Sequence, residues 1–249
     1  MVKLAVLFVV VLVTATISGV FGMAGGLMLM GALTLAMPVS AAMVTHGAVQ
    51  LVSNGWRAVL HRQHIAWPII GFFGLGSALA AGVLALVTYE PTKAWVYLLL
   101  GFVPGLAWLP KQRFHLDAAR PSHALGCGLT VTGLNVAAGV SGPLLDVFFV
   151  RTALTRYQIV ATKAATQAFS HSVKIAFYGV PLFNSAQTTG LPPWWFFAIA
   201  APLAMIGAWL GGQVLDRMND RSFLQWTRWI VSGLGVIYLI QATILFATG

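Results

Sequence analysis

One polar segment of this chain occurs twice. Residues 45–57 (THGAVQLVSNGWR) recur 117 positions later as residues 162–174 (TKAATQAFSHSVK). The same offset pairs three upstream positions: Ser18 with Asn135, Gly22 with Gly139, and Gly25 with Gly142. Internal duplication restricts the fold to two related halves, and in an apolar chain it is a recurring property of transporters.

The composition places these halves in a lipid bilayer. Hydrophobic residues make up 59% of the chain and charged residues only 8%, whereas a soluble domain averages about 25% charged residues. The net charge of +9 is spread over short loops between apolar spans, so we expect no nucleic-acid partner. Cys127 is the single cysteine, which excludes a disulfide within the chain.

Eight apolar segments are long enough to reach across or deep into a membrane. They cover residues 4–37, 39–60, 65–89, 92–110, 122–150, 155–179, 194–214 and 222–247. The first and fifth are longer than one crossing, and small residues interrupt them at 18–26 and 139–143. Glycine and proline weaken a helix, so each interruption predicts two half-helices. Irregular backbone at membrane depth requires a protein interior or a water-filled cavity around it.

Loop charge indicates that the two interrupted segments turn back as re-entrant hairpins. With hairpins, nine basic residues fall on one side (Arg62, Lys111, Arg113, Arg120, Arg151, Arg156, Arg217, Arg221 and Arg228) and only Lys3 and Lys93 on the other. Because basic loops stay cytoplasmic, both termini should lie outside the cytoplasm. The predicted fold is an all-α integral membrane protein with two inverted-topology repeats. Each repeat has a broken, re-entrant helical hairpin and three transmembrane helices.

This arrangement makes residues 1–249 a single membrane domain. Repeat 1 covers residues 4–110, a basic cytoplasmic linker covers 111–121, and repeat 2 covers 122–247. The second copy holds about 14 additional residues near 180–193. They carry no charge and precede Trp194 and Trp195, so they predict an extracytoplasmic loop that meets an aromatic interface belt.

The duplicated segment gives each half a polar stripe along one helix face. The stripes are His46, Gln50, Ser53, Asn54 and Arg57 in the first half, and Lys163, Gln167, Ser170, His171 and Lys174 in the second. Such side chains can join helices through hydrogen bonds worth about 1 kcal/mol each. Two matched stripes instead favour a polar pathway, with Gln50 and Gln167 near the bilayer midplane.

The cations of these stripes fit an anionic substrate. Inversion places Arg57 and Lys174 near opposite mouths of a shared path, although both can also extend to the headgroups. Lys163 lies closer to the midplane and needs a carboxylate, water or an anionic ligand. Asp146 is a structural ion-pair partner for Lys163, a protonatable coupling group, or a first-turn acid that suits its half-helix. His46 and His171 are either proton carriers or hydrogen-bonded structural residues.

The interruptions add a second element to this site. A half-helix N-terminus exposes unpaired N–H groups and the positive end of the helix dipole. Such N-termini are expected at Gly25 and Gly26 in the first half and at Ser141 and Gly142 in the second, where they would bind an anion between the repeats. The alternative is close helix packing, because residues 22–26, 101–105 and 207–211 each carry a Gly-xxx-Gly pattern.

Motifs for catalysis or for nucleotide hydrolysis are missing. The sequence has no HExxH motif, no GxSxG elbow, no phosphate loop and no Cys/His cluster. We therefore expect no enzyme, no catalytic residue, no metal and no cofactor, and transport that is secondary or passive.

The glycine-rich first hairpin GVFGMAGGLML, the polar second helix and their inverted second copy resemble the sulfite exporter TauE/SafE family. The similarity covers roughly residues 5–245, although the family's common GxGGG cluster reads Gly22-Met23-Ala24-Gly25-Gly26 here. It implies a small multi-pass permease of the bacterial inner membrane, with both termini periplasmic.

The implied substrate class is sulfite or an organosulfonate, and the paired stripes and helix breaks favour its export by alternating access. The histidines and Asp146 suggest proton coupling, sodium coupling is an alternative, and the oligomeric state is undetermined. A passive anion channel, a permease for another small organic anion and a membrane-embedded enzyme remain alternatives.

Overall fold

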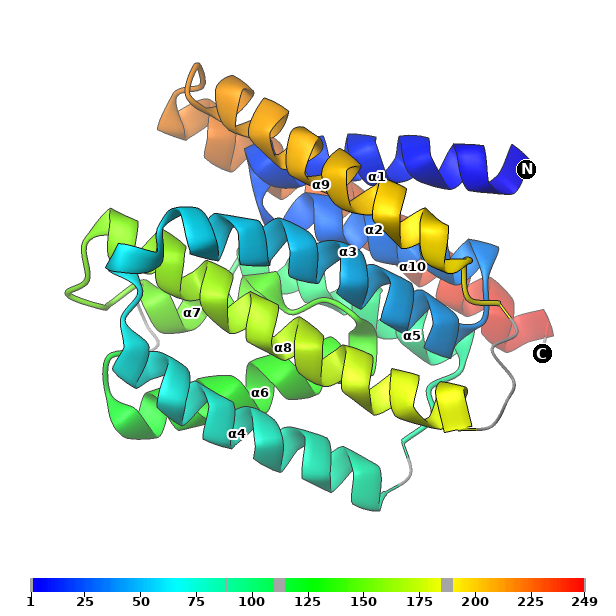
Figure 1. The fold of residues 1–249 in the computed structure, drawn as a ribbon, viewed down its shortest axis with the longest axis horizontal. Coiled ribbons are helices and arrows are strands. Elements are labelled where there is room, and N and C mark those ends of the chain that lie inside the picture. The colour runs from blue at the N-terminus through cyan, green and yellow to red at the C-terminus, as the bar shows by residue number, and fades with distance from the viewer. Residues whose placement is uncertain (1, 88, 110–114, 185–189, 249) are drawn as a thin grey trace.

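All regular elements of the described residues are helical. The structure, a computed structural model, describes residues 2–87, 89–109, 115–184 and 190–248 (Figure 1). The first half contains α1 (Val2–Phe21), α2 (Met23–Ala36), α3 (Val39–Leu60), η1 (Arg62–His64), α4 (Trp67–Leu86), α5 (Lys93–Phe102) and η2 (Val103–Ala107). The second contains α6 (Pro121–Ala138), α7 (Gly142–Phe149), α8 (Arg156–Asn184), α9 (Trp194–Leu215) and α10 (Asp220–Thr248). The predicted all-α class is confirmed.

Several helices have the length and composition of membrane spans. Stretches at Leu4–Phe21, Trp67–Leu86, Trp194–Leu215 and Gln225–Thr248 are long and apolar enough to cross a bilayer. Helices α3 and α8, which carry the polar stripes, are 22 and 29 residues long. Their polar faces are turned inward, where Thr45, His46, Thr162 and Thr166 are fully buried. Polar residues in a membrane helix normally face the bundle interior, so the predicted membrane protein is confirmed.

The predicted segment limits agree with the helices to within a few residues, with one exception. Helix α8 continues through Pro181 to Asn184, so the expected loop at 180–193 begins inside a helix. Proline is tolerated there because neighbouring groups in a membrane bundle can satisfy the backbone group that it frees. The rest of that predicted loop falls partly on residues 185–189, outside the described residues.

Each of the two interrupted segments breaks at one glycine with positive φ. Gly22 separates α1 from α2 with φ 62°, and Gly139 follows α6 with φ 85°. The Gly22 N–H donates to Ser18 O at 2.9 Å, and the Gly139 N–H donates to Asn135 O at 2.8 Å. Left-handed backbone suits glycine, which has no Cβ, and it ends a helix without a steric penalty. The two breaks thus share a glycine with positive φ at positions 117 residues apart. They differ in ψ, which is −102° at Gly22 and −16° at Gly139, and in length, because α7 starts only at Gly142.

Both broken segments fold back as hairpins. Gly25 on α2 packs directly against the backbone of Thr14 and Ser18 on α1, which a straight helix would place far apart. In the second half, the Ala118 N–H donates to Phe148 O at 2.9 Å, so the end of α7 returns to the start of α6. The chain termini lie at the same end of the bundle (Figure 1).

Helices of the first half pack in pairs against helices of the second half. Helix α1 packs along α9, α6 packs along α4, and the stripe-bearing α3 and α8 pack against each other. Gly207 and Gly211 let α9 approach the α1 backbone at Leu12 and Thr16, and Gly128 lets α6 approach Phe73 on α4. The close-packing interpretation of residues 207–211 is therefore confirmed. The inverted repeats and their limits stay a prediction, which this reciprocal packing supports.

The basic loops gather at the end of the bundle away from the termini. The loops after α3, before α6, before α8 and after α9 lie there (Figure 1). They carry or adjoin Arg62, Arg120, Arg151, Arg156 and Arg217. Lys93 begins α5 at the other end. Lys111 and Arg113 of the predicted linker lie outside the described residues. The charge asymmetry used for the topology prediction thus has a geometric counterpart.

Candidate functional site

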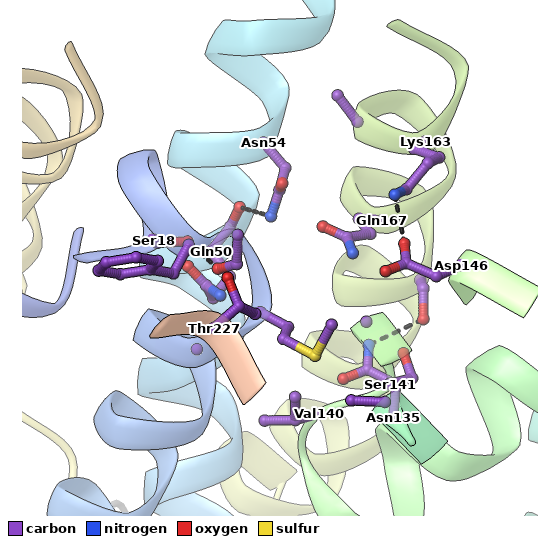
Figure 2. A pocket seen from close by; sticks show the side chains of 18 of the residues that line it. Ser18, Gln50, Asn54, Asn135, Val140, Ser141, Asp146, Lys163, Gln167 and Thr227 are labelled. Carbon is purple, nitrogen blue, oxygen red and sulfur yellow. Dashed lines mark hydrogen bonds and ion pairs between the residues drawn. The ribbon is translucent and has the colours of Figure 1, made fainter. Parts of the chain in front are cut away.

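A cavity of about 510 Å³ lies between the two helix breaks. Helices α2, α3, α7, α8 and α10 contribute to its wall (Figure 2). Its polar and charged lining consists of Ser18, His46, Gln50, Asn54, Arg57, Asn135, Ser141, Asp146, Lys163, Gln167, Ser170, His171, Thr227 and Arg228. The structure thus brings together most of the polar positions that the duplication singled out.

The N-termini of α2 and α7 meet at this cavity. Helix α2 begins at Met23 after Gly22, and α7 begins at Gly142 after Ser141; neither preceding residue makes a side-chain cap. A Cβ placed on Gly142 would lie 3.0 Å from Met23 Cβ, so the two helix starts adjoin. The dipoles of both helices and the N–H groups of their first residues make this junction electropositive. In α7, Pro143 has no N–H, and the Leu144 N–H donates to Ser141 O at 3.1 Å.

The sequence placed the start of α2 slightly too late. We expected it at Gly25 and Gly26, but the helix starts two residues earlier, because the left-handed turn is at Gly22. Gly26 lines the cavity. Gly25 instead faces α1, where a Cβ would collide with Ser18. Its lack of a side chain therefore serves the hairpin, and Gly25 is not a cavity residue.

Each central glutamine lies beside one of these half-helices. Gln50 Nε2 is 2.7 Å from an ideal Cβ on Gly26, and Gln167 Nε2 is 3.6 Å from one on Gly142. Figure 2 shows the two amides reaching into the cavity from α3 and α8. Within the described part of the chain, neither side-chain amide has a hydrogen-bond partner. The amides therefore do not join helices here and are free to bind a ligand.

A hydrogen-bonded cluster lies at the end of the cavity that is nearer to the chain termini. Asn135 Nδ2 donates to Ser170 Oγ at 2.8 Å and lies 3.3 Å from His171 Nδ1. With the amide in this orientation its nitrogen donates, and Nδ1 of His171 accepts. Ser53, the counterpart of Ser170, is buried and does not line the cavity. Asn135 was missed as a site residue, although its alignment with Ser18 was visible in the sequence.

Arg57 and Lys163 are the stripe cations that line the cavity. Lys163 Nζ forms an ion pair with Asp146, whose side chain is 24% exposed. The structure thus forms the ion pair that was one alternative for Asp146, and it places this residue beyond the first turn of α7. A coupling role for Asp146 stays a prediction. The structure gives Arg57 no hydrogen bond or ion pair with any described residue. A guanidinium without a protein partner in a membrane cavity favours an anionic ligand or water there.

Lys174 is not at a cavity mouth, which corrects its predicted position. Its side chain is fully buried, and its Nζ lies 2.8 Å from His46 Nδ1 and 2.9 Å from Gly139 O. Beside it, α3 and α8 approach so closely that a Cβ on Gly47 would be 2.7 Å from Ile175 Cγ1. This contact closes the cavity toward the chain termini. Toward the basic end, the lining continues to Arg57 on α3 and Ile159 on α8.

The outer part of the cavity includes residues outside the duplicated segments. Phe21 and Phe223 stack with ring centroids 6.4 Å apart, and the Arg228 guanidinium lies 5.2 Å from the Trp108 ring centroid. Phe223, Thr227 and Arg228 come from α10. Sequence reasoning missed them because no repeated pattern marks that helix.

Comparison with known proteins agrees with this architecture. The family described as Sulfite exporter TauE/SafE matches residues 7–241, nearly the whole chain. No curated protein and no solved structure matches it significantly. The matched range includes both helix breaks, both polar stripes and every cavity residue. The chain therefore belongs to the sulfite exporter TauE/SafE family.

Proposed function

We propose that this protein exports a small sulfur-containing anion, such as sulfite or an organosulfonate, across the bacterial inner membrane. The observation that carries the proposal is the Arg57 guanidinium, which has no partner among the described residues. It lines a cavity where two helix N-termini and the amides of Gln50 and Gln167, likewise without a described partner, meet. All of these groups supply N–H donors, and a sulfonate or sulfite head consists of acceptor oxygens. Family membership supports the same class of cargo.

Backbone and side chains have different parts in this proposed site. The N–H groups at the starts of α2 and α7 bind the head group, as helix N-termini commonly bind oxyanions. Gln50, Gln167, Asn54, Ser170 and His171 surround it. Hydrogen bonds to a charged partner are worth about 1.5–3 kcal/mol each. A few such hydrogen bonds can therefore give useful affinity for the anion without a basic side chain opposite each of its oxygens.

Asp146 keeps the site from binding too tightly. Its carboxylate neutralises Lys163, so Arg57 remains as the stripe cation without a partner in the described part of the chain. A transported substrate must also leave, and a cavity with several unpaired cations would retain an anion. Pairing Lys163 also avoids an isolated ammonium at membrane depth.

The cavity is closed at the end nearer to the chain termini, and this supports alternating access. Lys174, His46 and Gly139 form a buried contact on one side of the cavity, while Arg57 lines the cavity on the other side. The offset of 117 makes Arg57 the counterpart of Lys174 and Gly22 the counterpart of Gly139. In the opposite state, we propose that Arg57 closes the cavity near Gly22 while Lys174 separates from Gly139. A passive channel would need a continuous path, which this buried contact interrupts.

Flux into proteoliposomes tests the proposal. Purified protein should move sulfite and sulfoacetate, and Arg57→Gln should weaken binding of both roughly 10-fold to 150-fold, from the loss of one charged hydrogen-bond partner. Arg62→Gln is the matched control, because Arg62 is a basic residue just beyond α3 and outside the cavity. Absence of flux for both anions, or equal effects of the two variants, would contradict the assignment.

A further inference from the structure

The buried contact at Lys174 closes the cavity and also contains groups that can bind a proton. Lys174 is fully buried, and the structure records no carboxylate within ion-pair distance of it among the described residues. Its two recorded partners are an imidazole nitrogen of His46 and the carbonyl of Gly139. Lysine is a compact charge that readily loses its proton when it is removed from water.

Hydrogen-bond geometry fixes the roles of both partners. His46 Nε2 lies 3.1 Å from Gly26 O, and a carbonyl only accepts, so Nε2 carries the ring proton. Nδ1 of the neutral ring then has the lone pair and accepts from Lys174. Gly139 O accepts a second N–H. A neutral amine has two N–H groups and thus satisfies both acceptors, while an ammonium brings a third N–H that has no recorded partner.

We propose that Lys174, hydrogen-bonded to His46, is the site of an exchangeable proton that is transported together with the substrate anion. The proton binds to the lone pair of the lysine nitrogen. In this conformation the two existing hydrogen bonds persist whether Lys174 is neutral or protonated. This inference rests on the anion-transport function proposed above. It identifies the coupling ion of the same site.

Electrostatics link the proton to the anion. Among the described residues, two titratable groups lie near Lys174: His46 on α3 and His171 on α8, whose rings meet edge to face at 5.6 Å. Two backbone carbonyls complete the surroundings: Gly26 O of α2 accepts from His46, and Gly139 O at the break after α6 accepts from Lys174. His46 also lines the cavity, so one side chain separates the lysine from a bound anion. A protonated Lys174 and an anion in the cavity therefore stabilise each other, and each is unfavourable alone at membrane depth.

A metal cation fits this position less well. Sodium sites in transporters use backbone carbonyls at helix breaks, but here Lys174 itself occupies the Gly139 carbonyl. The other groups near Lys174 that could bind a cation are the imidazole rings of His46 and His171. Co-transport of one proton with one anion has no fixed direction. The sum of the proton gradient and the anion gradient decides the direction of transport. Export follows when the anion is more concentrated inside.

Sulfoacetate flux with simultaneous recording of lumenal pH tests the proposal. Both acidic groups of sulfoacetate stay ionised near neutral pH, so any proton that moves is carried by the protein. An imposed sulfoacetate gradient should change the lumenal pH of wild-type vesicles. Lys174→Gln, which keeps two N–H donors but does not titrate, should lose this pH change and still exchange labelled sulfoacetate for unlabelled sulfoacetate.

Two further variants complete the design. Lys174→Arg, whose side chain stays protonated, should also exchange sulfoacetate without moving protons. Lys93→Gln, at the start of α5 and away from the cavity, should behave as wild type. Wild-type sulfoacetate flux without a pH change, or flux driven by sodium, would overturn the proton site and leave anion transport intact. Loss of exchange in both Lys174 variants would make Lys174 purely structural. No flux at all would contradict the proposed function itself.

Discussion

Replacing Gln50 or Gln167 by Ala should reduce anion affinity while leaving the fold unchanged. Both side chains line the cavity, and neither amide has a hydrogen-bond partner in the described part of the chain. Each lies beside a different half-helix, Gln50 near Gly26 and Gln167 near Gly142. Truncation therefore leaves no protein group unsatisfied, and the lost contact is the one to substrate.

The size of the effect follows from that contact. A hydrogen bond to a charged partner contributes about 1.5–3 kcal/mol, and about 1.4 kcal/mol corresponds to a tenfold change in affinity. Each variant should thus bind sulfoacetate roughly 10-fold to 150-fold more weakly. The melting temperature without ligand should change little, because a cavity-facing amide makes few packing contacts.

A buried interhelical hydrogen bond provides the control. Ser77 Oγ lies 2.7 Å from Thr132 Oγ1 between α4 and α6, away from the cavity. Ser77→Ala should lower the melting temperature, at a cost of about 0.6–1.7 kcal/mol, without changing affinity. Ligand binding and thermal unfolding, measured on the same three purified variants, separate the two effects. The reasoning is refuted if the glutamine variants behave like Ser77→Ala and bind sulfoacetate normally.

Three other outcomes are expected. Gly128→Ala should destabilise the protein by about 1–3 kcal/mol, because its Cβ would collide with the α4 backbone; Gly126→Ala, where nothing lies within 4 Å, should be nearly neutral in the same thermal assay. Asp146→Asn should strengthen sulfoacetate binding a few-fold and lower stability, since it removes a negative charge from the anion cavity and breaks the pair with Lys163; unchanged titration curves would argue against an anion there. With the topology proposed here, a cysteine at Gln63 should resist membrane-impermeant thiol reagents in intact spheroplasts, and one at Glu90 should react. The buried native Cys127 should give no background, and the reverse labelling pattern would invert the orientation.

Local sequence determined the helices and their breaks. Apolar runs predicted the spans, because a backbone in lipid must satisfy its own hydrogen bonds as a helix. Gly22 and Gly139 were found through the duplication, and both adopt left-handed backbone that a side chain would disfavour. The stripes were equally visible, since residues three and four apart share a helix face.

Tertiary structure decided which stripe residues reach the cavity. Arg57 and Lys174 occupy equivalent positions in the duplicated segment, yet Arg57 lines the cavity and Lys174 is buried against His46 and Gly139. The sequence cannot separate them, because their environments depend on where α3 and α8 converge. That point is set by contacts between residues far apart in the chain, such as Gly47 with Ile175. A repeat in sequence thus fixes which residues are equivalent, and the packing of the two halves gives equivalent residues different roles.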